Sequence, residues 1–282
     1  MERTREFNTP LLKLEFIEND EPELVFVPHC HDRYEVYCFL SGQVEFRVEG
    51  VFCAMEPGTV LLVDRSRFHS ARISGTAEQP YRRMILHIDP ALFYPGEEIL
   101  FSLFRRPEIL YPAAWQNGLE ARAAALERAA HAPEAVRDIA IRTETAGFLL
   151  ELFARSDAAV APQEEQPRLR EVIQYINAHL TEPLTLEGLA ERFYMSRNSL
   201  ARSFKKAMGT TVPDYILYKR MALARVLLQS GHPVGVTARE CGYGDYSTFY
   251  RCYRKVYGRN PSEPLQTDAP ADTALAPSPE DL

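Results

Sequence analysis

Three side chains that can bind metals or polar ligands lie close together near the N-terminus, in the segment PHCHDRYEVYCFLSG. His29 and His31 are separated by one residue, and Glu35 follows four residues later. Because alternate side chains of a β-strand point to the same face, a regular strand here places all three on one side of a sheet. Two imidazoles and a carboxylate can hold Zn, Ni, Mn or Fe(II), or form hydrogen bonds with the hydroxyl groups of a polar ligand.

The elements around this segment have the pattern of antiparallel β-structure. From residue 11 to about residue 88 apolar side chains alternate with polar or aromatic ones, as in Val36, Cys38 and Leu40. Turn signals recur at short, even intervals, with SG at 41–42, EG at 49–50 and PG at 57–58. Short strands at even spacing are typical of a sandwich or barrel, so we expect an antiparallel β jelly-roll over residues 1–90.

The pattern changes to helical spacing after residue 90. Residues 119–130 and 135–153 are rich in Ala, Leu, Glu and Arg, and they predict two helices within a helical subdomain over 91–157. One stripe of the second helix either packs against the β-domain or forms a dimer seam, and the sequence leaves both interpretations open. The stripe consists of Val136, Ile139, Thr143, Ala146 and Leu150.

Charge divides the chain into unlike parts. The net charge of the whole chain is -7, but residues 1–167 carry 17 Lys and Arg against 27 Asp and Glu, whereas residues 168–262 carry 15 against 7. A basic block within an acidic chain indicates a module that binds a polyanion. Residues 158–167 have the composition of a linker, and residues 266–282 have that of a disordered tail.

Two helix-turn-helix patterns occupy the basic block, over residues 168–265. In the first, Thr185 and Ser196 can cap two successive helices separated by a three-residue turn. In the second, Asp245 can cap the helix that begins YSTFYRCYRKVYG. Residues 213–230 form one continuous helical pattern between the two units, about 27 Å long at about 1.5 Å per residue. That length can hold two recognition helices near one turn of DNA apart, about 34 Å.

This basic block resembles the DNA-binding domain of the AraC/XylS transcription regulators over about 100 residues. The resemblance rests on the runs SRNSLARSFKKAMGTTVPDYILYKRMALARVLLQSG and CGYGDYSTFYRCYRKVYGRNPSE. It implies binding of double-stranded DNA, with base-edge contacts from one set of side chains and phosphate contacts from another. The implied base-edge contacts come from Asn198, Arg202, Tyr246, Ser247, Thr248 and Arg251, and the implied phosphate contacts come from Arg197, Lys205 and Lys206.

The β-half, in turn, resembles the cupin-like sensor domain that many members of that family carry. The spacing of His29, His31, Glu35 and Gly42 is that of the first metal motif of cupin enzymes, and PGTVLLVDRSRFHS places His69 where the second motif has its third histidine. The second motif is degenerate, which leaves three interpretations of the cluster. The four residues His29, His31, Glu35 and His69 form an effector pocket without metal, bind a divalent metal, or are purely structural.

We therefore expect a two-domain α+β chain that regulates transcription. The β-domain would sense a small polar effector, such as a sugar, and the chain would act as a homodimer without enzymatic activity. The alternative is a metal-dependent cupin enzyme fused to a DNA-binding domain. Five cysteines without CxxC spacing, no signal peptide and no apolar run of about 18 residues predict a cytoplasmic protein that makes no contact with membranes.

Overall fold

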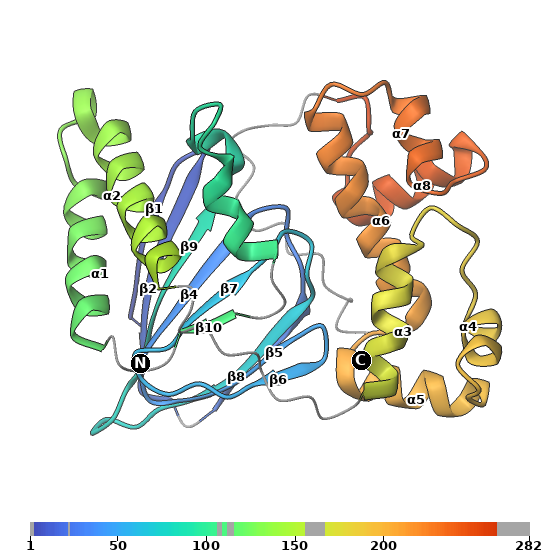
Figure 1. Ribbon diagram of the computed structural model, residues 1–282, viewed down its shortest axis with the longest axis horizontal. Helices are drawn as coiled ribbons and strands as arrows, with labels where there is room; N and C mark the ends of the chain where they lie inside the picture. Colours follow the sequence, from blue (N-terminus) through green and yellow to red (C-terminus); the bar gives the residue numbers. More distant parts are fainter. Residues whose placement is uncertain (1–2, 22, 106–108, 112–115, 156–166, 264–282) are drawn as a thin grey trace.

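The computed structural model describes residues 3–21, 23–105, 109–111, 116–155 and 167–263. Figure 1 shows a β-domain with a layer of helices on one side and an all-helical domain on the other. The expected fold class is confirmed, with an antiparallel β-domain followed by helices and a C-terminal helical region. Apart from Pro167, the linker expected over 158–167 and the tail expected over 266–282 lie outside the described residues.

Two antiparallel sheets face one another in the β-domain. One has the order β1-β2-β9-β4-β7-β10 and the other the order β3-β8-β5-β6. The first sheet includes one strand before residue 11 and one after residue 88. It therefore extends beyond the region in which the alternating pattern predicted strands. The strands are β1 (Arg3–Asn8), β2 (Leu12–Asn19), β3 (Leu24–His29), β4 (Tyr34–Ser41), β5 (Gln43–Val48), β6 (Val51–Cys53), β7 (Val60–Val63), β8 (His69–Ser74), β9 (Tyr81–Ile88) and β10 (Ile109–Tyr111).

Strand β4 is buried on both faces because it has a packed layer on each side. Val36 and Cys38 belong to the core formed with the helices outside the six-stranded sheet, whereas Tyr37 and Phe39 belong to the core between the two sheets. The same parity places Glu35 in the interior of the β-domain, on the face of Tyr37. Alternation along β4 therefore places Glu35 on the face opposite the one that packs against the helices.

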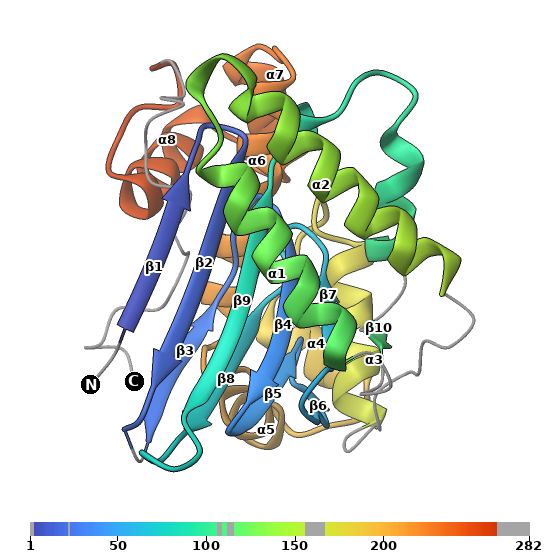
Figure 2. The ribbon, with the colours of Figure 1, turned by 90° about the vertical axis from the view of Figure 1, so that its left-hand side faces the viewer.

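Two short 3-10 helices, η1 (Pro90–Leu92) and η2 (Glu98–Arg105), lead to the long helices α1 (Gln116–Ala130) and α2 (Glu134–Ala154). Figure 2 shows α1 and α2 lying across the outer face of the six-stranded sheet. The helix α2 buries Ile141, Phe148, Leu149 and Leu152 there. Of the expected stripe, Val136, Ile139 and Leu150 are instead 47%, 60% and 57% exposed, and Ala146 packs against the core. The interpretation that the stripe as a whole packs against the β-domain is therefore wrong.

The C-terminal domain consists of α3 (Pro167–Ala178), α4 (Leu186–Arg192), α5 (Arg197–Met208), α6 (Val212–Gln229), α7 (Val234–Glu240) and α8 (Tyr246–Tyr257). Figure 1 shows α4 and α5 at one end of α6, and α7 and α8 at the other. The three expected helix caps are confirmed, because the side chains of Thr185, Ser196 and Asp245 accept hydrogen bonds from the first turns of α4, α5 and α8. The long connecting helix is also confirmed.

Candidate effector site and DNA interface

Three imidazoles surround one carboxylate oxygen inside the β-domain. The Nε2 atoms of His31, His87 and His69 lie 2.9, 3.1 and 3.2 Å from Oε2 of Glu35. All four side chains are buried, with 2 to 6% of each residue exposed. They come from the β3–β4 connection, β4, β8 and β9, so the cluster joins the two sheets.

The segment that carries the first histidines is not one strand, contrary to the sequence expectation. Strand β3 ends at His29 and belongs to the four-stranded sheet, whereas β4 begins at Tyr34 and belongs to the six-stranded sheet. The chain must bend to cross from one sheet to the other, and His31 lies in that bend. His31, Glu35 and His69 come together, whereas His29 is only partly buried, with its ring centroid 4.3 Å from that of His69.

His87 is a member of the cluster that sequence reasoning missed. It lies on β9, and the antiparallel pairing of β9 with β4 sets it directly opposite Glu35. No local spacing connects two residues that are 52 positions apart. The signal that could have found it is the register of the pairing, which places Arg83, Ile85 and His87 of β9 beside Phe39, Tyr37 and Glu35 of β4.

Backbone carbonyls fix the orientation of two of the imidazoles. Nδ1 of His31 lies 3.0 Å from the carbonyl oxygen of Arg33, and Nδ1 of His69 lies 3.0 Å from that of Arg67. Carbonyl and carboxylate oxygens both only accept, so each of these rings lies between two acceptors. A neutral imidazole donates to one of the two, and a protonated imidazole donates to both. When Nδ1 donates to the carbonyl, the Nε2 atom of a neutral ring can bind a cation beside Glu35.

The pKa shifts agree with a charged pair at the centre of this cluster. Burial acts to raise the pKa of Glu35, but the charge on His69 and the bonds from the imidazoles hold it well below its usual range. Burial acts to lower the pKa of His69, but the carboxylate of Glu35 outweighs it and the pKa is raised. Burial dominates for His31, whose pKa is lowered. The shifts thus favour opposite charges on Glu35 and His69, whereas burial disfavours the charged form of His31.

The donor set also fits a divalent cation. The ligand atoms of His31, Glu35 and His69 all lie within 4.8 Å of one another. Ligands about 2.1 Å from a tetrahedral ion lie about 3.4 Å apart, and the Nε2 atoms of His31 and His69 lie 2.9 and 3.2 Å from Oε2 of Glu35, which is close to that spacing. The carbonyls that hold Nδ1 supply the outer hydrogen bonds that orient metal-binding histidines. A bound ion would neutralise Glu35 and offer an open position to an oxygen ligand.

Further polar groups lie in the interior near the cluster, among apolar side chains such as Phe46 and Val48. The hydroxyl groups of Tyr37 and Tyr81 are hydrogen-bonded to each other, and the guanidinium of Arg83 lies 4.7 Å from the ring centroid of Phe26. Arg83 is only 7% exposed. Burial of so many polar groups is costly unless they bond to one another or to a ligand. The interior therefore suits a ligand that has several hydrogen-bonding groups.

The helices α5 and α8 present the residues expected to contact DNA. Arg197, Asn198, Arg202, Lys205 and Lys206 are exposed on α5, while Leu200 and Phe204 are buried beneath them. On α8, Tyr246, Ser247 and Arg251 are exposed and Thr248 is half-buried, above the buried Phe249 and Tyr253. Each set thus lies on the outward face of the second helix of a helix-turn-helix unit, the face that enters a major groove.

Two local contacts affect these residues. Nε of Arg197 lies 2.7 Å from Oε1 of Glu187 on α4, and one terminal nitrogen of Arg251 donates to Thr248 at 3.3 Å. Tyr194, in the turn between α4 and α5, is 95% exposed and has φ 53°. The sequence pattern predicted a turn here but did not reveal the large exposed ring next to the basic helix.

The fold and the two sites define a DNA-binding protein with a ligand-binding β-domain, and the comparisons with known proteins agree. The model of the AraC-like ligand binding domain matches residues 11–132, and that of a helix-turn-helix domain matches residues 189–267. The chain belongs to the AraC/XylS family of transcription regulators. Among the described residues, no helix is both long and apolar enough to cross a membrane.

Similar proteins span nearly the whole chain. The probable transcriptional regulator LumQ of Photobacterium leiognathi is 23% identical over 91% of this chain and 97% of its own length. The HTH-type transcriptional activator RhaS of Salmonella arizonae is 26% identical over 88% of this chain and 90% of its own length. A solved structure of ToxT from Vibrio cholerae covers 89% of this chain and 95% of its own, with 11% identity and a TM-score of 0.38.

Proposed function

We propose that the β-domain binds a small polar effector at the buried cluster of His31, Glu35, His69 and His87, with His29 at its edge. The observation that carries this proposal is the convergence of three imidazoles on one buried carboxylate oxygen. Imidazole and carboxylate groups bond readily to hydroxyl groups, so a sugar is the effector class that we favour. Effector binding would change how the two helix-turn-helix units engage DNA.

We propose that the two units read base edges with Asn198 and Arg202 on α5 and with Tyr246, Ser247, Thr248 and Arg251 on α8. Asn and Arg bond bidentately to adenine and guanine edges. Arg197, Lys205 and Lys206 would contact phosphates, which sets affinity and salt dependence. The exposure of these side chains on the outward faces of two similar helices supports the assignment.

The test is selection of sheared bacterial genomic DNA by the purified full-length protein at physiological salt. We expect enrichment of a motif with two short half-elements about one helical turn apart. Genes beside the enriched sites then nominate effectors, and His31→Ala should abolish the response to the effector, whereas the isolated fragment of residues 165–265 should keep its DNA affinity. The absence of any enriched sequence would contradict the DNA-binding proposal, and a normal response in His31→Ala would contradict the assigned pocket.

The convergence of the donor atoms also favours a second candidate, in which a divalent metal is part of the effector site. Protein purified without a His-tag, supplied with Zn²⁺, Ni²⁺ or Mn²⁺ and desalted, would then retain about one equivalent. Retention of less than about a tenth of an equivalent of metal would show that metal is not part of the effector site. His87→Gln should reduce retention if His87 is a ligand.

We propose further that the chain acts as a homodimer and binds its ligand without turning it over. Support for the dimer comes from the exposed apolar stripe of α2, and support for binding without turnover comes from relatives that carry the names of transcription regulators. Residues 1–90, 91–157 and 168–265 would act as sensor, dimerisation subdomain and DNA-binding domain. Turnover of a sugar or small acid by residues 1–160 alone would instead favour the metal-dependent enzyme.

A further inference from the structure

A buried carboxylate joins the β-domain to the connecting helix α6. Glu49 lies at the turn between β5 and β6, where its φ is 49°, and it is 3% exposed. Nζ of Lys219 donates to Oε1 of Glu49 at 3.2 Å, and the hydroxyl of Tyr215 donates to Oε2. The amide nitrogen of Phe68 also donates to Glu49, at 3.1 Å. One side chain of the β-domain is thus held by two residues of α6.

These charges are buried and mutually satisfied. Lys219 is only 8% exposed, and its Nζ also donates to the carbonyl oxygen of Ser66 at 2.7 Å. Burial acts to raise the pKa of Glu49, but Lys219, Arg67 and the bonds from Tyr215 and Phe68 outweigh it, so the pKa is lowered. Removal of one partner of such a pair leaves an uncompensated buried charge, which is strongly unfavourable. The contact is therefore sensitive to either side chain.

Close packing surrounds the ionic contact. The ring of Phe68 lies 5.0 Å from that of Tyr215, and both belong to one core with Leu200 and Phe204 of the first helix-turn-helix unit. At the end of α5, Gly209 has φ 65°, and a Cβ there would lie 2.4 Å from Cγ of Pro28. The β-domain thus contacts both α6 and the end of the recognition helix α5.

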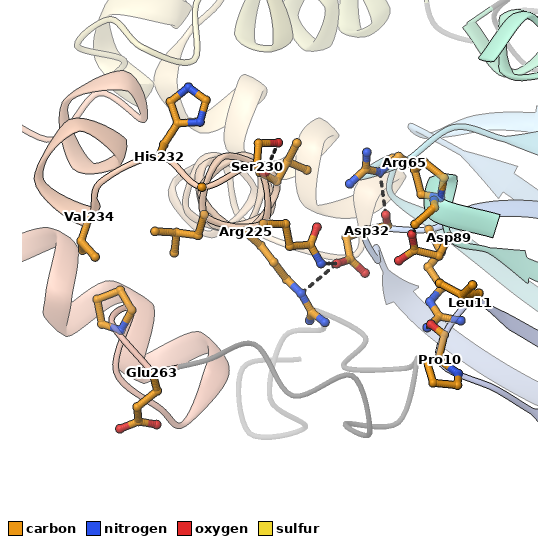
Figure 3. A pocket seen from close by; sticks show the side chains of 18 of the residues that line it. Pro10, Leu11, Asp32, Arg65, Asp89, Arg225, Ser230, His232, Val234 and Glu263 are labelled. Carbon is orange, nitrogen blue, oxygen red and sulfur yellow. Dashed lines mark hydrogen bonds and ion pairs between the residues drawn. The ribbon is translucent and has the colours of Figure 1, made fainter. Parts of the chain in front are cut away.

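A second ionic contact lies beside a cleft between the two domains. One carboxylate oxygen of Asp32 lies 2.8 Å from Nε of Arg225 on α6, and it also accepts from Gln229 at 3.2 Å. Figure 3 shows the pair of Asp32 and Arg225 at the wall of the cleft, whose volume is about 800 Å³. On this side, therefore, polar contacts beside a cleft join the two domains, in contrast to the close packing around Phe68 and Tyr215.

The same two chain segments carry the effector site and the interface. His31 turns into the β-domain, whereas its neighbours Cys30 and Asp32 face the helical domain. His69 likewise turns inward and Phe68 turns outward. The amide nitrogen of Ser66 donates to the carbonyl oxygen of His31 at 2.7 Å, while the carbonyl of Ser66 accepts from Lys219. A shift of His31 or His69 therefore moves groups that hold α6.

We propose that Glu49 and Lys219 form an electrostatic latch that couples the effector site to the first DNA-binding unit. The latch fixes the orientation of α6, and with it α5, relative to the β-domain. It does not cover the exposed face of α5, so it controls the placement of the unit and does not block DNA. Displacement of residues 30–32 and 66–69 by a ligand at the histidine cluster would loosen the latch. This inference rests on the proposed effector site.

Hydrogen exchange of the full-length protein tests the latch without effector or DNA. We expect Glu49→Gln and Lys219→Met each to speed exchange of amides in α6 about tenfold. Glu45→Gln on β5 and Lys255→Met on α8, both at exposed positions, are the matched controls and should leave exchange in α6 unchanged. Unchanged exchange in α1 and α8 shows that both domains remain folded in every variant.

Coupling to the cluster is tested by a double-mutant cycle. His31→Gln and His69→Gln should speed exchange in α6 in the wild-type background, and add little once Glu49→Gln is present. Exchange in α6 within about twofold of wild type in both latch variants would overturn the latch. Equal effects of the histidine variants in both backgrounds would overturn the coupling. A failed genomic selection would contradict the DNA-binding proposal but would leave these exchange rates unchanged. The latch and the DNA-binding proposal can therefore be refuted independently.

Discussion

At the scale of single residues, Glu35 organises the candidate effector site. Its Oε2 atom lies within 3.2 Å of three imidazole nitrogens, and it supplies the negative charge that raises the pKa of His69. A buried carboxylate is tolerated only where partners compensate for its lost hydration. The imidazoles provide this compensation, and each of them loses a partner when the charge is removed.

Glu35→Gln should therefore destabilise the protein. At pH 7 we expect the free energy of unfolding to fall by about 3 kcal/mol, because the attraction between Glu35 and His69 is lost and buried imidazole nitrogens lose their ionised acceptor. Glu45→Gln, the same substitution at an exposed position of β5, should stay within about 0.5 kcal/mol of wild type. Urea denaturation measures both values, and equal losses in the two variants would mean that Glu35 is not the centre of a charged cluster.

The composition of the cluster shows how far sequence reasoning reaches at this scale. His31, Glu35 and His69 could be identified from local spacing and resemblance, and they come together in the structure. His87 could not, because its proximity to Glu35 depends on which strands pair and in what register. His29 was grouped with them because a regular strand was assumed, yet the chain bends after it to change sheets.

At the scale of elements, the helices of the DNA-binding domain begin where capping side chains permit. The Oγ atom of Ser196 accepts from the amide of Ser199 at 3.1 Å, which satisfies one of the free donors in the first turn of α5. Arg197 and Asn198 follow directly in that turn. The cap therefore fixes the end of the helix that is expected to enter the major groove.

Ser196→Ala should lower the stability of the DNA-binding domain by about 1 kcal/mol and weaken DNA binding through fraying of this turn. Ser196→Asp, which keeps an acceptor, should preserve most of the stability. Ser203→Ala within the same helix is the matched control, and it should be neutral or slightly stabilising because Ala is the better helix former. Thermal unfolding followed by circular dichroism separates the variants, and equal melting temperatures for all three would contradict a role for the cap.

Elements with strong periodic patterns could be predicted well, and short ones could not. The connecting helix, expected over 213–230, is observed as α6, and the pair expected over 119–130 and 135–153 is observed as α1 and α2. Strands β1 and β10 were missed because each obtains its hydrogen bonds from one neighbour at a sheet edge. Edge pairing is a tertiary property, and the residues of these strands carry little pattern of their own.

The outer face of α2 bears apolar side chains that the fold leaves exposed. Ile139 and Leu150 are 60% and 57% exposed, while Phe148 and Leu149 fill the contact with the sheet. A helix with apolar groups on both faces is typical of an element that packs on two sides. The second partner that we propose is the same helix of another copy of the chain.

Ile139→Asp should then convert a dimer into a monomer without unfolding it. The expected result is loss of the dimer in sedimentation equilibrium at micromolar concentration, because a carboxylate placed in an apolar seam loses its hydration without gaining a partner. Ile99→Asp places the same group at another position that is also 60% exposed, and it should leave the association unchanged. A monomeric wild-type protein, or a dimer that survives the substitution, would exclude this face as the seam.

At the scale of the whole molecule, the two domains are joined by charge as well as by apolar packing. Phe68 and Cys30 of the β-domain belong to the core of the first helix-turn-helix unit, and Glu49 and Asp32 form ion pairs with α6. An apolar interface alone would hold the domains together over a wide range of pH. Ion pairs make docking depend on the protonation of particular carboxylates, and Glu49 is the more deeply buried of the two.

The contribution of Glu49 to stability should disappear in acid. Its pKa is lowered in the folded protein, so the unfolded chain takes up the proton first as the pH falls, and folding then loses the advantage of the ionised carboxylate. Lys219, Arg67 and Tyr215 surround Glu49, and the charge of Glu49 also acts on Cys30 and His69. Glu49→Gln resembles the protonated state at every pH. The difference in unfolding free energy between wild type and Glu49→Gln should thus be complete above the ordinary value of 4.5 and shrink below it. Urea denaturation from about pH 7 to about pH 3.5 measures this difference, and a difference that stays constant over that range would show that Glu49 does not join the domains through its charge.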